Sequence, residues 1–361
     1  MISFFSYVDV GMIWKRLFAL LSGEHESLPR AEFVATLETE GIEYKVVDVL
    51  DQVLRLEVRN LDVDVIATRL SMTKLICEEL AAVEGVALSD IVAAVDSVDW
   101  SFLKGKSFVC RLIRVKTYGA GLSKYQVEKS MGATILKRVC GCAKVDVRNP
   151  DEVIVCIVTG NRAIIGRVLR EVNRGSFQER RPRRRPVFHP SSLDAYTSRL
   201  FVNLARAPRG GVVLDPFCGV GGILVEAGLI GCECVGVDID EFMVRGSAVN
   251  TEYYSVKSIG VVLGDARRLG FRHECVDAIA TDPPYGRAAS TKKTPLEELL
   301  RKFIECSSMV LKRGKYMCFA HPSWIDVSDY LRDHGFAVVE KHSMRVHSSL
   351  TRIVEVVRKV K

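Results

Sequence analysis

The chain places Asp282-Pro283-Pro284-Tyr285 directly after an apolar run at 276–281. That run is expected to be a strand, so the four residues lie in the loop at its carboxyl end. An amine on an aromatic ring is a poor nucleophile, because its lone pair is delocalised into the ring. The Asp282 carboxylate and the Pro283 carbonyl can each accept one amine hydrogen, while Tyr285 can stack on an extruded base. We therefore expect these four residues to be catalytic, with the prolines stiffening the loop.

A second loop follows the short apolar run at 212–214 and opens a helix. A strand, a glycine-rich turn and a helix start form the usual frame of a ligand-binding loop. The residues expected to bind the ligand are Asp215, Phe217, Gly219, Gly221 and Gly222. Glycines allow close backbone approach. For S-adenosylmethionine the bound end would be an amino acid, whose carboxylate suits the helix N-terminus and whose ammonium suits Asp215.

An acidic residue also ends the next expected strand, at 234–237. Asp238 lies about 20 residues after the glycine loop, where an acid accepts hydrogen bonds from ribose hydroxyls. Ile239 follows it, and Asp240 is a second candidate for the same role. Taken alone, each acid could be an ordinary helix cap.

The third expected strand, at 261–263, is followed by Asp265 and Ala266. Asp265 would take the adenine amino group, and Ala266 would offer backbone contacts. With Asp282 as the last member, acids then stand in register at four successive strand ends, which predicts S-adenosylmethionine as the cofactor. Weaker candidates for lining a base pocket follow the fifth strand: Tyr316, Cys318, His321 and Trp324.

Strands and helices alternate from residue 191 onward. Strands are expected at 212–214, 234–237, 261–263, 276–281 and 317–320, and helices at 191–205, 221–229, 241–250, 296–311 and 327–334. This order predicts an α/β domain at 191–361, with a parallel sheet and helices on both faces. Two final strands, at 336–340 and 353–357, are close enough to pair as an antiparallel ribbon. Such a ribbon distinguishes methyltransferase-like sheets from the ordinary dinucleotide fold.

The region before residue 170 predicts two smaller α+β modules. The first, at 1–60, has strands at 18–21, 44–49 and 53–58 and a helix at 29–37. The second, at 61–169, has helices at 73–83, 91–95 and 124–140 and strands at 108–115, 153–158 and 163–168. Residues 170–190 contain two prolines and five arginines in one short run, which predicts an extended linker outside any packed element.

Positive charge gathers before and within this linker. From Arg162 to Arg185 there are nine arginines and two acids, a net charge of +7 that equals the net charge of the whole chain. Arginine suits bidentate phosphate contact and base stacking. The residues predicted to bind RNA are Arg162, Arg180, Arg181, Arg183, Arg184 and Arg185. The alternative is a solvated linker without a ligand.

The bulk composition fits a cytoplasmic enzyme. Hydrophobic residues make up 48% and charged residues 26% of the 361 residues, which is typical of packed domains. No apolar run approaches the roughly 20 residues of a membrane span, and no signal peptide is recognisable. The eleven cysteines are expected to be reduced thiols. They form no CxxC pair, so no metal site is predicted.

Three segments together resemble one known family. The Asp215–Gly222 loop, the Asp282–Gly286 loop and the Arg-Arg-Pro…Arg-Pro-Val-Phe-His-Pro linker at 180–190 are similar to those of archaeal tRNA (guanine(10)-N2)-methyltransferases. Upstream, 108–114, 164–167 and the turn at 149–151 resemble a THUMP domain preceded by a ferredoxin-like module. The resemblance implies a class I, Rossmann-like methyltransferase domain with a seven-stranded sheet after these two modules.

The resemblance also implies substrate and partners. Its N-terminal half would bind the acceptor end of tRNA, and its catalytic domain would methylate the N2 amine of guanosine 10 once or twice. A small zinc-binding activator protein would pair with the catalytic domain. Asp-Pro-Pro-Tyr occurs in enzymes that act on several bases, so a different tRNA guanine stays open. A non-catalytic RNA-binding protein with a vestigial cofactor fold is the alternative from another class.

Overall fold

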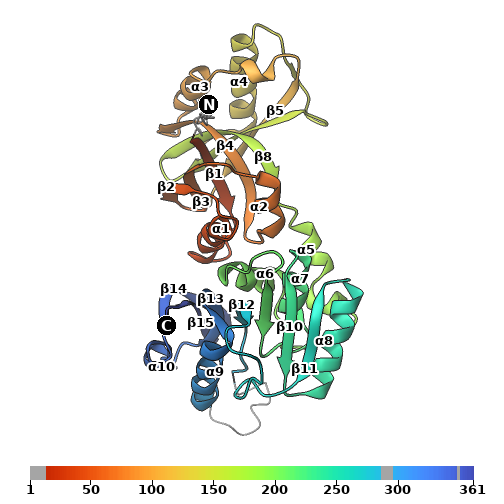
Figure 1. Ribbon diagram of the computed structural model, residues 1–361. Coiled ribbons are helices and arrows are strands. Elements are labelled where there is room, and N and C mark those ends of the chain that lie inside the picture. The colour runs from red at the N-terminus through yellow and green to blue at the C-terminus, as the bar shows by residue number, and fades with distance from the viewer. Residues whose placement is uncertain (1–13, 286–295, 348–349) are drawn as a thin grey trace, which may run out of the picture. The chain divides into compact units, whose positions relative to one another are not determined.

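A computed structural model describes residues 14–285, 296–347 and 350–361 of the chain (Figure 1). Gly286 of the catalytic loop lies outside these residues. The described residues divide into two compact units, of which the first holds 14–24, 42–67 and 73–172 and the second holds 25–41, 68–72 and those from 173 onward. No helix in the described ranges is long and apolar enough to cross a bilayer.

The first unit is built on one eight-stranded sheet in the order β2-β3-β1-β4-β8-β7-β5-β6. Its strands are β1 (Lys15–Leu21), β2 (Tyr44–Leu50), β3 (Val53–Val58), β4 (Thr73–Glu84), β5 (Ser107–Arg114), β6 (Lys144–Val145), β7 (Glu152–Thr159) and β8 (Arg162–Glu171). The sheet runs without a break across the boundary that the sequence predicts near residue 60. Pairing is antiparallel except between β5 and its two neighbours.

Helices cover this sheet. They are α2 (Val63–Arg69), α3 (Leu88–Asp96), the single turn η1 (Ser101–Leu103) and α4 (Lys124–Arg138). The buried faces of α3 and α4 share one hydrophobic cluster with β5, β7 and β8, which includes Trp100, Phe108 and Met131. Strand pairing therefore leaves one apolar face that these two helices bury.

The expected helix at 73–83 is wrong. The segment is β4, which pairs with β1 on one side and with β8 on the other. Leucine, glutamate and alanine favour a helix locally, but hydrogen bonding along both edges of a strand overrides a propensity of a few tenths of a kcal/mol per residue.

The second unit contains the predicted seven-stranded sheet, in the order β11-β10-β9-β12-β13-β15-β14. Its strands are β9 (Val212–Asp215), β10 (Glu233–Asp238), β11 (Ser258–Leu263), β12 (Val276–Thr281), β13 (Leu311–Pro322), β14 (Phe336–His347) and β15 (Leu350–Lys359). The first five of these in the sheet are parallel, and β15 is antiparallel to both of its neighbours. The class I methyltransferase sheet with its terminal ribbon is thus confirmed.

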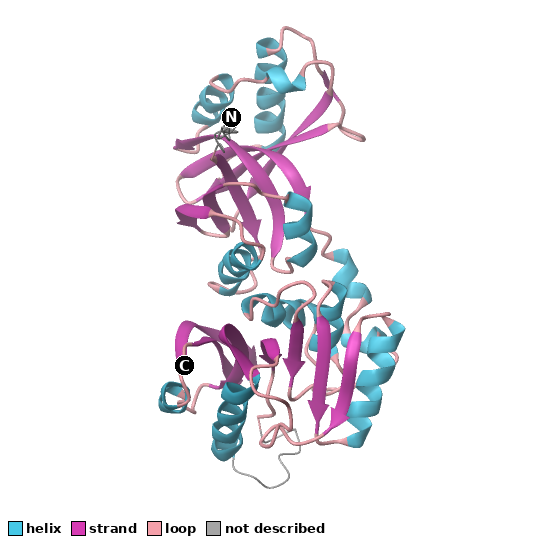
Figure 2. Ribbon diagram, in the orientation of Figure 1, coloured by secondary structure: helices cyan, strands magenta, loops and turns pink. Residues whose placement is uncertain are grey.

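Helices flank both faces of this sheet (Figure 2). The helices of the second unit are α1 (Leu28–Thr39), α5 (Gly175–Glu179), the turn η2 (Pro182–Arg184), α6 (Ala195–Leu204), α7 (Gly222–Leu229), α8 (Glu241–Tyr253), α9 (Leu296–Val310) and α10 (Ser328–Asp333). One core cluster joins α1, α6 and α7 to the sheet. A second joins α9 and α10 to the opposite face, around Phe303 and Phe319.

The prediction of an extended linker at 170–190 is wrong, because 170–171 end β8 and 173–190 are a packed part of the second unit. Phe177 of α5 is buried and stacks on Tyr196 with ring centroids 4.8 Å apart. The guanidinium of Arg180 lies over the Phe177 ring at 4.7 Å. Proline did not prevent this packing, since Pro182 stands at the first position of η2, where its missing N–H costs nothing.

Candidate active site

The four predicted loops meet at the carboxyl ends of the parallel strands. They line one cavity of about 800 Å³, which is the place where open α/β sheets bind ligands. The predicted residues that line it are Asp215, Phe217, Gly219, Gly222, Asp238, Ile239, Asp265, Ala266, Asp282, Pro283, Pro284 and Tyr285. The structure therefore brings the expected cofactor and catalytic residues together.

Gly221 is the predicted cofactor residue that the structure places elsewhere. Its backbone is left-handed, with φ of 82°, and it caps α7. A Cβ on this residue would lie 2.5 Å from Oγ of Ser247 in α8. Glycine is therefore required here by the turn and by the close approach of two helices, rather than by the cavity.

Asp238 ties the second strand end to the glycine loop. Its Oδ2 accepts a hydrogen bond from the backbone N–H of Gly219 at 2.9 Å, and its Oδ1 accepts one from that of Asp240. Burial raises the pKa of Asp238 above its ordinary value, although these hydrogen bonds oppose the shift. The carboxylate holds the loop and keeps further lone pairs for ribose hydroxyls.

Asp265 forms a bidentate ion pair with Arg267. Nη2 of Arg267 lies 2.6 Å from Oδ2 of Asp265, and Nε lies 2.9 Å from both carboxylate oxygens. This pairing lowers the pKa of Asp265. The neighbouring Ala266 is buried at the cavity wall. Sequence reasoning did not single out Arg267, although its spacing from Asp265 allows the contact.

Asp215 is the most deeply buried acid of the site, with 2% of its surface exposed. Its Oδ1 accepts hydrogen bonds from the Thr281 hydroxyl at 2.6 Å and from the Phe217 N–H at 3.2 Å. Burial raises the pKa of Asp215 to about 7, and the nearby charges of Asp238 and Asp282 add to the rise. A ligand ammonium would reverse this shift, because it stabilises the charged form.

Two side chains hold the carboxylate of Asp282, the residue predicted to be catalytic. The Tyr285 hydroxyl donates to Oδ1 of Asp282, and Nη1 of Arg352 donates to Oδ2 at 3.1 Å. Burial raises the pKa of Asp282, and the Arg352 charge and the Tyr285 hydrogen bond oppose that rise. Arg352 was not predicted from sequence, where it is a single basic residue just before the strand expected at 353–357.

Other residues of the cavity were missed by sequence reasoning. The helix expected at 191–205 begins only at Ala195, because the Asp194 carboxylate caps it by accepting from the Thr197 N–H at 3.0 Å. The segment before this cap is therefore a loop, and it lines the cavity. Its cavity residues are His189, Ser191, Ser192 and Leu193, and other residues missed are Met243, Arg267, Leu299 and Leu350. Asp240, the second candidate for the ribose contact, also lines the cavity.

The weaker pocket candidates divide. Trp324 lines the cavity, with 62% of its surface exposed. His321 is buried and contacts Oε1 of Glu355 at 3.4 Å. Tyr316 lies under the guanidinium of Arg206, and Cys318 is buried in the core. His321, Tyr316 and Cys318 are not among the residues that line the cavity.

The predicted RNA-binding arginines differ in their surroundings. Arg162, in the first unit, is paired with Asp48 and Glu84. Arg180 is paired with the buried Glu226, and Arg185 is itself buried. Arg181, Arg183 and Arg184 are exposed. The structure leaves these last three side chains most accessible to a ligand.

Arg185 packs under the cofactor loop instead of facing solvent. A Cβ on Gly222 would lie 2.7 Å from Nη1 of Arg185. Nε of Arg185 donates to the Arg180 carbonyl at 3.0 Å, and burial lowers the pKa of its guanidinium. Gly222 thus makes room for the arginine as well as for the turn.

The lining of the cavity fits S-adenosylmethionine. Acids stand where an ammonium and ribose hydroxyls need acceptors, and Gly219 leaves open space where its side chain would be. Ile239, Met243 and Leu299 supply an apolar wall for a flat ring. Among the described residues, no group of three or more histidine, cysteine or acidic side chains is placed to hold a metal ion.

Comparisons with known proteins place the chain in a family. Residues 182–353 match a family model described as the methyltransferase domain of the RMKL-like group, UPF0020. The chain is 36% identical to the tRNA (guanine(10)-N2)-dimethyltransferase of Methanothermobacter thermautotrophicus, over 95% of this chain and 99% of the relative. It is also 36% identical to the protein of the same name from Pyrococcus abyssi, over 74% and 79%. The crystal structure of TrmN from Thermus thermophilus shares the fold, with a TM-score of 0.54 and 20% identity, over 96% of this chain and all of that one.

Proposed function

Because the chain belongs to the tRNA (guanine(10)-N2)-dimethyltransferase family, we propose that it methylates the N2 amine of guanosine 10 in tRNA with S-adenosylmethionine. The observation that carries this proposal is one cavity that holds both the three acids of the cofactor loops and Asp282-Pro283. The relatives' names include a second methyl transfer. We therefore propose N2,N2-dimethylguanosine as the final product, with N2-methylguanosine as the intermediate.

The residues of the catalytic loop would activate the amine by accepting its hydrogens. Bound S-adenosylmethionine supplies a methyl group on a positively charged sulfur, ready for transfer to a nucleophile. Asp282 accepts one hydrogen of the guanine amine and the Pro283 carbonyl accepts the other, which directs the nitrogen lone pair toward the methyl carbon. Each hydrogen bond that strengthens in the transition state contributes about 1–3 kcal/mol, and positioning contributes more.

Tyr285 has a defined place beside this amine. Its hydroxyl is bonded to Asp282, and its ring packs against the hydrophobic cluster of α6 and α7. Stacking of guanine on Tyr285 remains a prediction, and the exposed Trp324 at the cavity is a second aromatic surface for it.

We propose that the first unit binds the acceptor end of tRNA as a THUMP-type module. The supporting feature is α4, whose exposed residues include Lys124, Lys129, Lys137 and Arg138. Several exposed basic residues on one helix suit the phosphate backbone of RNA. A tRNA substrate, together with eleven free cysteines, supports a cytoplasmic location.

We also propose that a small zinc-binding activator protein binds the edge strand β11. This strand is last in the sheet, so one side of its backbone is unpaired. Ile259, Val262 and Leu263 are each about half exposed on it, and Tyr253 of the adjacent α8 is 64% exposed. Such an apolar edge suits a partner that adds a strand.

The experiment is methyl transfer from labelled S-adenosylmethionine to unmodified tRNA transcript, followed by nucleoside analysis. The expected products are N2-methylguanosine and then N2,N2-dimethylguanosine, both absent from a transcript with another base at position 10. If label still enters the altered transcript, the enzyme methylates a guanine at another position. No label, with the zinc-binding protein also present, would favour the non-catalytic RNA-binding alternative.

A further inference from the structure

Arg352 lies beside the catalytic loop, although it is 70 positions from Asp282 in the sequence. The reason is the reversed direction of β15. In the register of the ribbon Arg352 stands opposite Pro322, at the carboxyl end of β13. Because β15 runs opposite to β13, it begins at the edge of the sheet where the parallel strands end. The first residues of β15 therefore lie at the edge that holds the site.

Arg352 contacts two residues of the loop at once. Its Nη1 is 3.1 Å from Oδ2 of Asp282, and its Cζ is 5.5 Å from the centroid of the Tyr285 ring. The Tyr285 hydroxyl donates to the other oxygen of Asp282. The carboxylate is thereby held from both sides, and each oxygen keeps a lone pair for the amine.

The burial of Arg352 is difficult to explain by stability alone. Only 8% of its surface is exposed, and its Nε has no hydrogen-bond partner within the described parts of the chain. A buried unpaired donor costs about 1–3 kcal/mol. A buried ion pair is also often no more stable than an apolar replacement. Such a group needs another explanation, and its contact with the catalytic carboxylate supplies one.

We propose that Arg352 is a positioning residue that keeps the Asp282 carboxylate ionised and fixed in the orientation that accepts the guanine amine hydrogen. This inference rests on the proposed function. In the reaction N2 forms a bond to the methyl carbon, while the carbon–sulfur bond breaks and leaves its electron pair on sulfur. The cationic N2 is then a strong acid, and its proton passes to Asp282 and on to solvent.

The electrostatic surroundings of Asp282 agree with this role. Burial raises its pKa, and the nearby charge of Asp215 on β9 is unfavourable to its ionised form. The buried Cys318 on β13 stays a neutral thiol, because burial raises its pKa well above the ordinary value. The Tyr285 hydrogen bond and the Arg352 charge act in the opposite direction. Arg352 is a cation in direct contact with the Asp282 carboxylate, so its removal would leave Asp282 protonated to a higher pH.

The test compares Arg352→Met and Arg352→Lys with the wild-type enzyme, by kcat and KM from about pH 6 to about pH 9. We expect the acidic limb of the kcat profile of Arg352→Met to move upward by about one pH unit or more. The kcat near neutral pH should fall about tenfold or more, with little change in KM for S-adenosylmethionine. Arg352→Lys keeps the charge and should restore part of both.

Arg358→Met is the matched control, because Arg358 is on the same strand, is exposed, and donates to the Gly314 carbonyl instead of the site. Its pH profile should equal that of the wild type. If Arg352→Met does not fold, by thermal denaturation, the neutral and polar Arg352→Gln takes its place. An unshifted limb in a folded neutral variant would overturn the inference, whereas an inactive wild type would instead refute the proposed function.

Discussion

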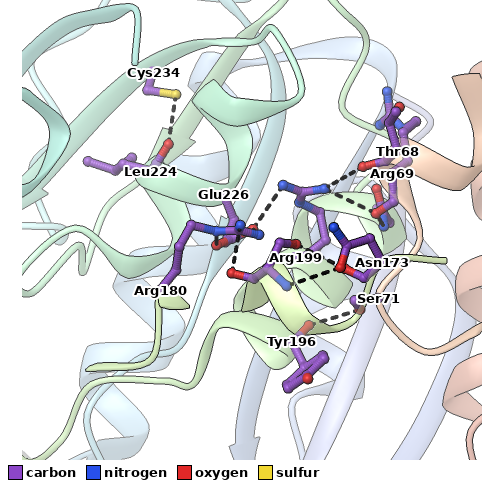
Figure 3. A network of polar contacts seen from close by, with 12 residues as sticks. Thr68, Arg69, Ser71, Asn173, Arg180, Tyr196, Arg199, Leu224, Glu226 and Cys234 are labelled. Atoms are coloured by element: carbon purple, nitrogen blue, oxygen red, sulfur yellow. Dashed lines mark hydrogen bonds and ion pairs between the residues drawn. The ribbon is translucent and has the colours of Figure 1, made fainter. Parts of the chain in front are cut away.

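Arg180 and Glu226 form a buried ion pair, with Nε of the arginine 2.8 Å and Nη2 3.2 Å from the two carboxylate oxygens (Figure 3). Glu226 lies in α7, has no exposed surface, and is also 2.8 Å from Nη2 of Arg199 in α6. The arginine-rich segment is therefore anchored to the helix that begins in the cofactor loop. An arginine that sequence reasoning assigned to RNA here has a structural partner.

Arg180→Ala should destabilise the protein, because it leaves Glu226 buried with one cation in place of two. Removing one partner of a buried ion pair costs about 3–5 kcal/mol, and we expect the lower end because Arg199 remains. Arg181→Ala is the control, since Arg181 is exposed and its loss should change stability by less than about 0.5 kcal/mol. Urea denaturation of both variants measures the difference. Equal denaturation midpoints for the two variants would mean that the ion pair contributes nothing to the stability of the fold.

The three exposed arginines provide the RNA prediction. Replacing Arg181, Arg183 and Arg184 together by alanine should weaken tRNA binding and flatten its salt dependence. If all three contact phosphates, the slope of log affinity against log salt should fall by about two to three. Fluorescence titration of labelled tRNA at several salt concentrations gives the slope. An unchanged slope would show that these three arginines do not contact tRNA phosphates. Circular dichroism of the variant is the control, because it would exclude unfolding as the cause of weaker binding.

The burial of individual arginines in this segment could not be predicted from the sequence. Arg180 and Arg181 are adjacent and chemically identical, yet one is buried against Glu226 and the other is exposed. Which of them turns inward depends on a helix about 46 positions later. The helix expected at 73–83 failed for the same reason, because its two partner strands are distant in sequence.

The cofactor loops were predictable because their signals are local. A strand end, a following acid and a glycine turn lie within a few residues of one another, and parallel strands must bring their carboxyl ends to one edge. Arg352 lacked such a signal. Its place beside Asp282 depends on the register of the antiparallel strand β15. A shift of that register by one residue would turn its side chain to the other face of the sheet.

Asp282→Ala should abolish methyl transfer while tRNA and cofactor affinities stay near those of the wild type. The reason is that the lost acceptor acts on the amine in the transition state more than on either bound ligand. We expect kcat to fall at least about 100-fold. Single-turnover transfer and equilibrium binding measure the two effects separately. Loss of both affinities would instead identify Asp282 as a residue that holds the loop together.

Val262→Asp on β11 tests the activator partner. A charge at this half-exposed position of the edge strand should prevent an added strand from packing, so a zinc-binding activator protein should fail to copurify after co-expression. Val338→Asp is the control, because Val338 is similarly exposed on β14 at the opposite edge of the sheet. The zinc content of the purified complexes gives the measurement. Equal zinc in both variants would exclude β11 as the binding edge.

The affinity of the apo enzyme for S-adenosylmethionine should rise with pH toward neutrality. Asp215 has a pKa of about 7 in the free protein, so it is largely protonated below that pH and cannot pair with a cation. A ligand ammonium binds the ionised form, hence affinity should fall by up to about tenfold for each pH unit below about 7. Calorimetric titrations kept below about pH 7.5, where an α-amino group is still charged, measure this.

Thr281 offers a way to move that transition. Its hydroxyl donates to Asp215 at 2.6 Å and lowers the Asp215 pKa, in opposition to burial. Thr281→Val should therefore shift the pH dependence of cofactor binding to higher pH, while Thr281→Ser keeps the donor and should leave it in place. Asp215→Asn should bind weakly at every pH. An affinity that is flat with pH in the wild type would show that the ammonium does not meet Asp215, and the amino-acid end of the cofactor would then have to be assigned to another part of the loop.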